Sequence, residues 1–120
     1  MGSCFIPKLI GLLVVAANLI AAEPLPTNDY SAVDAIFTEH CLECHGSQDP
    51  EAKLVMESFD LLMKGGESGA VIVPGKSEES LLVRLIEGRV ERDGKKLIMP
   101  PGKKRDKLKP EQIALIRAWI

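Results

Sequence analysis

The segment Cys41-Leu42-Glu43-Cys44-His45 constrains the fold of this chain more than any other part of the sequence. It holds two thiols three positions apart, with an imidazole directly after the second. Three chemistries use these side chains at this spacing. They are a structural or redox-active disulfide, part of a zinc site, and the covalent attachment of a haem group.

The haem interpretation uses all three side chains of the segment. Each thiol can add across one vinyl group of a haem, and His45 then falls under the ring plane, where its imidazole can bind iron. A zinc site needs about four ligands, and the remaining candidate, His40, is badly placed to complete a tetrahedron. A thioredoxin-like redox pair needs a βαβ context, which the sequence lacks. We therefore predict haem c, attached covalently through Cys41 and Cys44, with His45 as an iron ligand.

Residues 1–22 have the organisation of a secretory signal peptide. Lys8 is their only charged residue, an apolar run follows it, and Ala21 and Ala22 close the segment. The run is shorter than the roughly 20 residues that span a bilayer, although an uncleaved membrane anchor stays the alternative. We expect an exported protein, located in the bacterial periplasm or outside the cell.

Cleavage would leave residues 23–30 as a leader or linker and residues 31–120 as one small domain. Cys41 and Cys44 would then be its only cysteines. The whole chain has a formal net charge of −2, which gives no general attraction to nucleic acid. Only five of its 120 residues are aromatic, so we expect a large bound group to complete the core.

Apolar periodicity and capping residues predict an all-α domain of about four short helices with long loops. No segment is typical of a strand pair, and the polar stretch 89–109 is expected to be a loop. The expected helices are one from a Ser31–Asp34 capping box to about His40, one over Phe59–Lys64 capped by Ser58, one capped by Ser77 and stopped by Gly88, and one from Pro110.

An iron atom bound by His45 needs a sixth ligand, for which the mature chain offers three methionines and one further histidine. Met99 precedes two prolines, whose rings fix φ and remove backbone donors, so its thioether can be held with little loss of entropy. Met56 and Met63 lie in segments better suited to core packing. We predict Met99 as the distal ligand; the alternative, His40, is more typical of a surface residue.

An ordered set of segments over residues 35–120 resembles the planctomycete-type cytochrome c domain, a branch of the class I cytochrome c fold. The matching segments are Phe37 with 41–46, the loop 65–69, 73–82, Met99-Pro100-Pro101 and 111–120. The resemblance implies a small class I cytochrome c-like domain wrapped around a covalently bound haem. It implies Cys41 and Cys44 as attachment residues, His45 as the proximal ligand and Met99 as the distal ligand.

The sequence departs from the family pattern in two places. Lys109 stands where the family usually has a Ser or Thr that caps the last helix, which would lower the stability of that helix. The chain ends at Ile120, where the family pattern normally continues, often into larger extracellular domains. A truncated gene product is therefore one expectation.

A haem with both axial positions filled leaves no site open to a substrate. The leading prediction is therefore a one-electron carrier that cycles between Fe(III) and Fe(II), and not an enzyme. No catalytic acid, base or nucleophile constellation stands out elsewhere in the sequence. The alternative is a haem-containing electron-entry, sensory or interaction module of a larger secreted protein or enzyme.

Charge is distributed unevenly along the chain. Residues 23–60 carry nine acids and one base, whereas residues 89–109 carry nine bases and three acids. The basic segment flanks Met99 and could steer a redox partner protein with an acidic docking face, the alternative being two ordinary solvated surfaces. We expect no nucleic acid partner and no membrane span in the mature chain.

Overall fold

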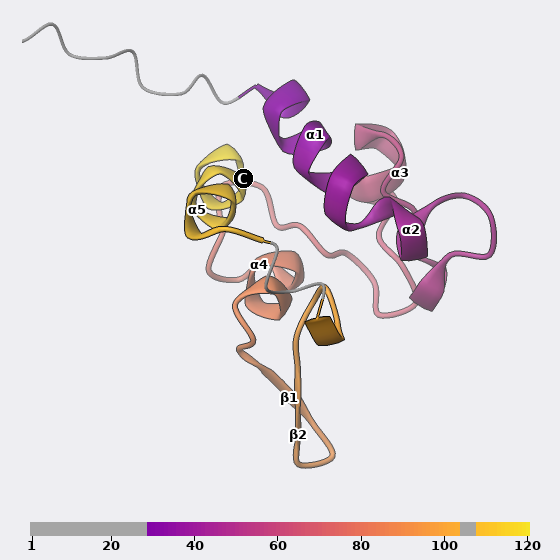
Figure 1. The fold of residues 1–120 in the computed structure, drawn as a ribbon, viewed down its shortest axis with the longest axis vertical. Helices are drawn as coiled ribbons and strands as arrows, with labels where there is room; N and C mark the ends of the chain where they lie inside the picture. Colours follow the sequence, from indigo (N-terminus) through magenta and orange to yellow (C-terminus); the bar gives the residue numbers. More distant parts are fainter. Residues whose placement is uncertain (1–28, 104–107) are drawn as a thin grey trace, which may run out of the picture.

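The computed structural model describes residues 29–103 and 108–120. The elements follow in the order α1 (Tyr30–His40), α2 (Leu42–His45), a 3₁₀ turn (Glu51–Lys53), α3 (Phe59–Lys64), α4 (Leu81–Ile86), β1 (Val90–Arg92), β2 (Lys95–Leu97) and α5 (Pro110–Trp119). This part of the chain is mostly helical, with one small two-stranded sheet (Figure 1). The predicted signal peptide and most of the predicted linker lie outside the described residues.

The core forms where α5 contacts both α1 and α4. The predicted apolar face of α1, made of Val33, Ile36 and Phe37, is buried there. Ile116 of α5 is also buried, and the rings of Phe37 and Trp119 meet edge to face with centroids 6.3 Å apart. Burial of these faces brings the first and last helices of the described chain together.

Capping residues predict the start of α3 correctly and the start of α1 incorrectly. Ser58 accepts a hydrogen bond from the backbone N–H of Leu61 at 3.3 Å, and α3 ends before Gly65, as the sequence predicts. The predicted cap of α1 is wrong by two residues. Asp29 caps that helix, because its carboxylate accepts the backbone N–H of Ser31 at 3.0 Å.

The helix α4 begins at Leu81, so the predicted start after Ser77 is wrong. The buried Ser80 has an extended backbone (φ −68°, ψ 123°), which separates the helix from the preceding turn. Its hydroxyl accepts from the N–H of Val73 at 2.9 Å and donates to the carbonyl of Lys76 at 3.0 Å. Ser80 therefore joins the extended segment before the helix to the helix start.

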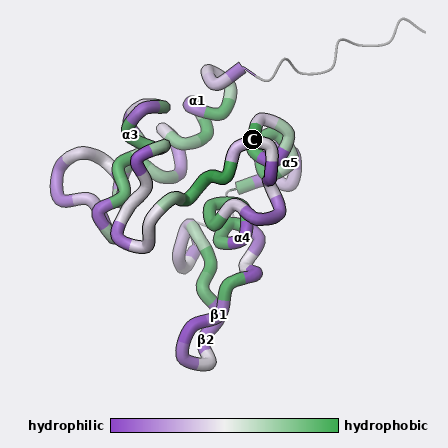
Figure 2. Tube along the Cα trace, turned by 180° about the vertical axis from the view of Figure 1, so that it is seen from behind, coloured by the Kyte–Doolittle hydropathy of each residue, from purple (hydrophilic) through white to green (hydrophobic). Residues whose placement is uncertain are grey.

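The all-α prediction is wrong for residues 90–97, which form an antiparallel hairpin with Val90 opposite Leu97. Its two-residue turn, Asp93-Gly94, has positive φ at both positions, 51° and 71°. Turns of this kind match the twist of the two strands, and Asp-Gly is among their preferred sequences. The hairpin projects away from the helices, and its tip is hydrophilic (Figures 1 and 2).

The start of α5 is capped from within the helix. The side-chain oxygen of Gln112 accepts the backbone N–H of Lys109 at 2.8 Å, which is the Gln half of a capping box. Further along α5, Arg117 pairs with Glu78 and with Glu87, and Glu87 lies at the end of α4. These contacts fix α5 against α4. Within residues 29–103 and 108–120, no helix is both long and apolar enough to cross a membrane.

Candidate haem site

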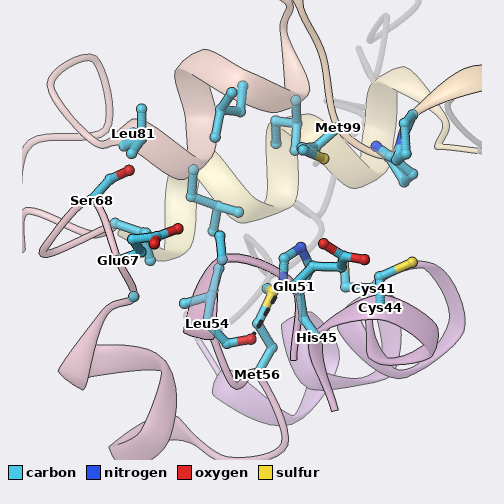
Figure 3. Close-up of a pocket in the computed structure, with 18 of the residues that line it drawn as sticks. Cys41, Cys44, His45, Glu51, Leu54, Met56, Glu67, Ser68, Leu81 and Met99 are labelled. Atoms are coloured by element: carbon cyan, nitrogen blue, oxygen red, sulfur yellow. Dashed lines mark hydrogen bonds between the residues drawn. The ribbon is translucent and has the colours of Figure 1, made fainter. Parts of the chain in front are cut away.

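A cavity of about 290 Å³ brings the predicted site residues together. Cys41, Cys44 and His45 line it from the region of α2, and Met99 lines it from the segment that follows β2. Figure 3 shows Met99 across the cavity from His45. Much of the remaining wall is apolar and includes Leu54, Met56, Leu82, Leu85 and Ile86.

His45 is held by backbone groups that leave one of its ring nitrogens free to bind a metal. Its Nδ1 lies 3.2 Å from the carbonyl oxygen of Leu54, and because a carbonyl can only accept, Nδ1 carries the proton. In the neutral imidazole, the Nε2 atom then keeps its lone pair. Metal-binding histidines usually donate their second ring nitrogen in this way. The carbonyl of Leu54 is a part of the site that the sequence analysis missed.

The thiols of Cys41 and Cys44 are free and partly buried. Burial, with a smaller contribution from Cys44, raises the pKa of the Cys41 thiol to about 11. A redox-active dithiol needs a lowered thiol pKa, so this environment disfavours that interpretation. In the described part of the chain, no group of three or more His, Cys, Asp or Glu side chains is placed to hold a metal ion. The zinc interpretation therefore has no support there.

The three methionines differ in their positions relative to the cavity. Met56 lines it but is a core residue with 1% of its surface exposed, and its backbone N–H donates to the carbonyl of His45 at 2.8 Å. Figure 3 shows Met56 on the same side as His45, with Met99 opposite. Met63 packs against the core outside the cavity lining. Of the three, Met99 is the one that lines the cavity on the side opposite His45.

His40 also lines the cavity, and its predicted surface location is wrong, because only 4% of its side chain is exposed. Its Nε2 lies 3.3 Å from the Nε2 of Gln112. The Gln112 oxygen already accepts the N–H of Lys109, so the amide nitrogen faces His40 and donates to it. In the tautomer that accepts this N–H, the His40 Nε2 lone pair is engaged with α5, which disfavours His40 as an iron ligand.

A tight turn closes the end of the cavity that lies away from the cysteines. Glu67 and Ser68 form its tip, and Figure 3 shows them at that end. The backbones of Gly66 and Gly69 exchange two hydrogen bonds of 3.0 and 2.9 Å. A Cβ at Gly66 would lie 2.7 Å from the carbonyl oxygen of Ala52, so this close approach requires glycine.

These side chains fit a haem group with two vinyl substituents. The cavity offers two unpaired thiols beside an imidazole with a free nitrogen, a thioether on the opposite wall, and apolar side chains around them. Apolar walls with a few convergent polar groups are typical of cofactor sites. The donor set is therefore compatible with the predicted cofactor.

The domain is small and mostly helical, and its Cys-x-x-Cys-His segment borders an apolar cavity. This combination is typical of cytochrome c-like proteins. The family model described as planctomycete cytochrome C matches residues 41–103, more than half of the chain. The chain therefore belongs to this family, which confirms the resemblance found in the sequence. Neither the curated proteins nor the solved structures include a match.

Proposed function

We propose that this protein is a one-electron carrier with a covalently attached haem c. The observation that carries the proposal is the convergence of the attachment motif and Met99 on one cavity, in a chain of a cytochrome c family. When bound, haem supplies an Fe(III)/Fe(II) couple. The chain itself contributes the attachment, the two axial side chains and an apolar surrounding.

Each site residue has one role in this proposal. Cys41 and Cys44 hold the cofactor by thioether bonds, and His45 binds iron through Nε2 while the Leu54 carbonyl fixes its ring. Met99 fills the sixth position and raises the reduction potential relative to a second histidine. With no position left for a substrate, we propose a carrier and not an enzyme. We further propose that the segment 1–22 directs export and that residues 31–120 form the cytochrome domain.

An absorbance-monitored redox titration of the protein from cells that mature c-type cytochromes tests this function. We expect a reversible one-electron transition and a reduced form that does not bind carbon monoxide, because both axial positions are filled. Rapid carbon monoxide binding would contradict the carrier and indicate an open iron position. Absence of a reversible couple would contradict electron transfer itself.

We also propose that basic residues near Met99 guide an acidic redox partner. Lys95 and Lys96 are exposed on the hairpin, and Lys103 is exposed just beyond Met99. Lys104 and Lys107, which belong to the same basic stretch, lie outside the described residues. Redox partners form small, transient interfaces whose association rates depend on such charges.

Reversal of Lys95, Lys96 and Lys103 to Glu should slow oxidation by ferricyanide, an anionic probe, severalfold at low salt. In 1 M salt, where the Debye length is about 3 Å, the wild type and the variant should converge. The matched control reverses Lys64, Lys76 and Arg84 to Glu, which are exposed and line neither cavity, and should have a smaller effect. Equal slowing by both triple variants would leave only a net-charge effect and contradict a local docking surface.

A further inference from the structure

Two carboxylates, those of Glu51 and Glu67, belong to the lining of the same cavity as His45 and Met99. Among the described residues of this lining there is no Lys or Arg to offset them. Neither carboxylate has an ion-pair partner within residues 29–103 and 108–120. The charged part of the described cavity wall is therefore acidic.

The backbone holds the segments of the two carboxylates together. Glu51 begins the 3₁₀ turn, and the N–H of Glu67 donates to the carbonyl of Ala52 within that turn at 2.7 Å. A second, more polar cavity adjoins this place, and its lining includes Asp49 and Lys53 together with both glutamates. The three acids and the single base, Lys53, give this place a negative net charge. The backbone hydrogen bond between Glu67 and Ala52 holds the two glutamate segments in place.

A fixed negative charge beside a redox centre favours the oxidised form, which carries one more positive charge than the reduced form. The net charge around a haem is one of the means by which a protein sets its reduction potential. Both glutamates are exposed, so solvent and salt weaken their field. The resulting effect is electrostatic and therefore sensitive to ionic strength.

We propose that the carboxylates of Glu51 and Glu67 lower the midpoint potential of the bound haem. The proposal rests on the function proposed above and adds two residues that adjust the driving force of electron transfer. In the proposed transfer a redox partner protein would be oxidised by one electron as Fe(III) is reduced to Fe(II), and no bond would form or break. The two glutamates act through their charge alone and bind nothing.

Spectroelectrochemical titration of the full haem-loaded protein at neutral pH and low salt tests this proposal. Glu51→Gln and Glu67→Gln should each shift the midpoint potential upward, and the double variant should shift it by about the sum. Ser68→Asp adds a carboxylate to the same exposed turn and should shift the potential downward. The absorption bands that report axial ligation should stay unchanged in all four proteins.

Glu79→Gln is the matched control, because Glu79 is 63% exposed and does not line the cavity. It should leave the potential nearly unchanged, and 1 M salt should reduce the shifts at the other three positions. Unchanged or lowered potentials in the Gln variants would overturn the proposal. So would shifts that salt does not reduce, since these would indicate a structural change.

The two proposals fail in different ways in this experiment. A wild-type protein that takes up no haem, or shows no reversible couple, would overturn the electron-carrier function and the role of the glutamates with it. A reversible couple at one common potential in the wild type and in all variants would overturn the role of the glutamates alone.

Discussion

Without haem, the Cys41→Ala/Cys44→Ala variant should lose its cooperative thermal unfolding transition. Without haem, the apolar wall of this cavity faces water, and each Å² of apolar surface left exposed forgoes about 25 cal/mol of stabilisation. The total stability of a small domain is only about 5–15 kcal/mol. Circular dichroism during heating, together with the near-ultraviolet signal of Trp119, measures the loss.

The physical reason is that the cavity wall and the hydrophobic core share residues. Leu54, Met56, Leu82 and Ile86 line the cavity and also belong to the buried core. A bound group that packs against them stabilises the folded state and has no matching site in the unfolded chain. The control is the wild-type chain made without cytochrome maturation, which keeps both thiols and should behave in the same way. A cooperative, native-like melt of either haem-free protein would contradict a haem-dependent core.

Met99→Leu should completely remove the weak charge-transfer band that marks a thioether bound to ferric haem, and should lower the midpoint potential. Leucine nearly conserves the volume of methionine, so loss of the ligand is separated from loss of packing. Absorption spectroscopy of the oxidised protein measures the band, and redox titration measures the potential.

Two further variants serve as controls for the assignment of the sixth ligand. Met63→Leu should keep the band, because Met63 lies outside the cavity lining. Met56→Leu should also keep it, because Met56 lies on the His45 side in Figure 3. Loss of the band in Met56→Leu with its retention in Met99→Leu would show that Met56 is the ligand.

Local sequence signals predicted those parts of the fold that local chemistry determines. Ser58 and Gly65 set both ends of α3, and the apolar spacing of α1 identified its buried face. The hairpin was predictable in principle from Asp93-Gly94, but the polar residues around that turn made the segment look like a loop. Both strands are mostly exposed and polar, so they lack the apolar alternation that predicts a strand.

The predicted site residues meet at one cavity, but the contacts that orient them come from distant parts of the chain. His40 is buried because Gln112, 72 residues later, lies against it, and no sequence signal near His40 indicates this contact. The carbonyl that orients His45 belongs to Leu54, and a backbone group leaves no mark in the residue types. The N–H of Glu67 donates to the carbonyl of Ala52, which holds the Glu67 turn beside the 3₁₀ turn that Glu51 begins.

Covalent attachment of haem is the central claim, and denaturing mass spectrometry tests it most directly. The mature chain, purified from cells that attach haem to a known c-type cytochrome, should have the mass of the polypeptide plus one haem. The Cys41→Ala/Cys44→Ala variant from the same cells should have the mass of its polypeptide alone. A wild-type chain that also shows only its polypeptide mass, while the known cytochrome carries its haem, would contradict the claim.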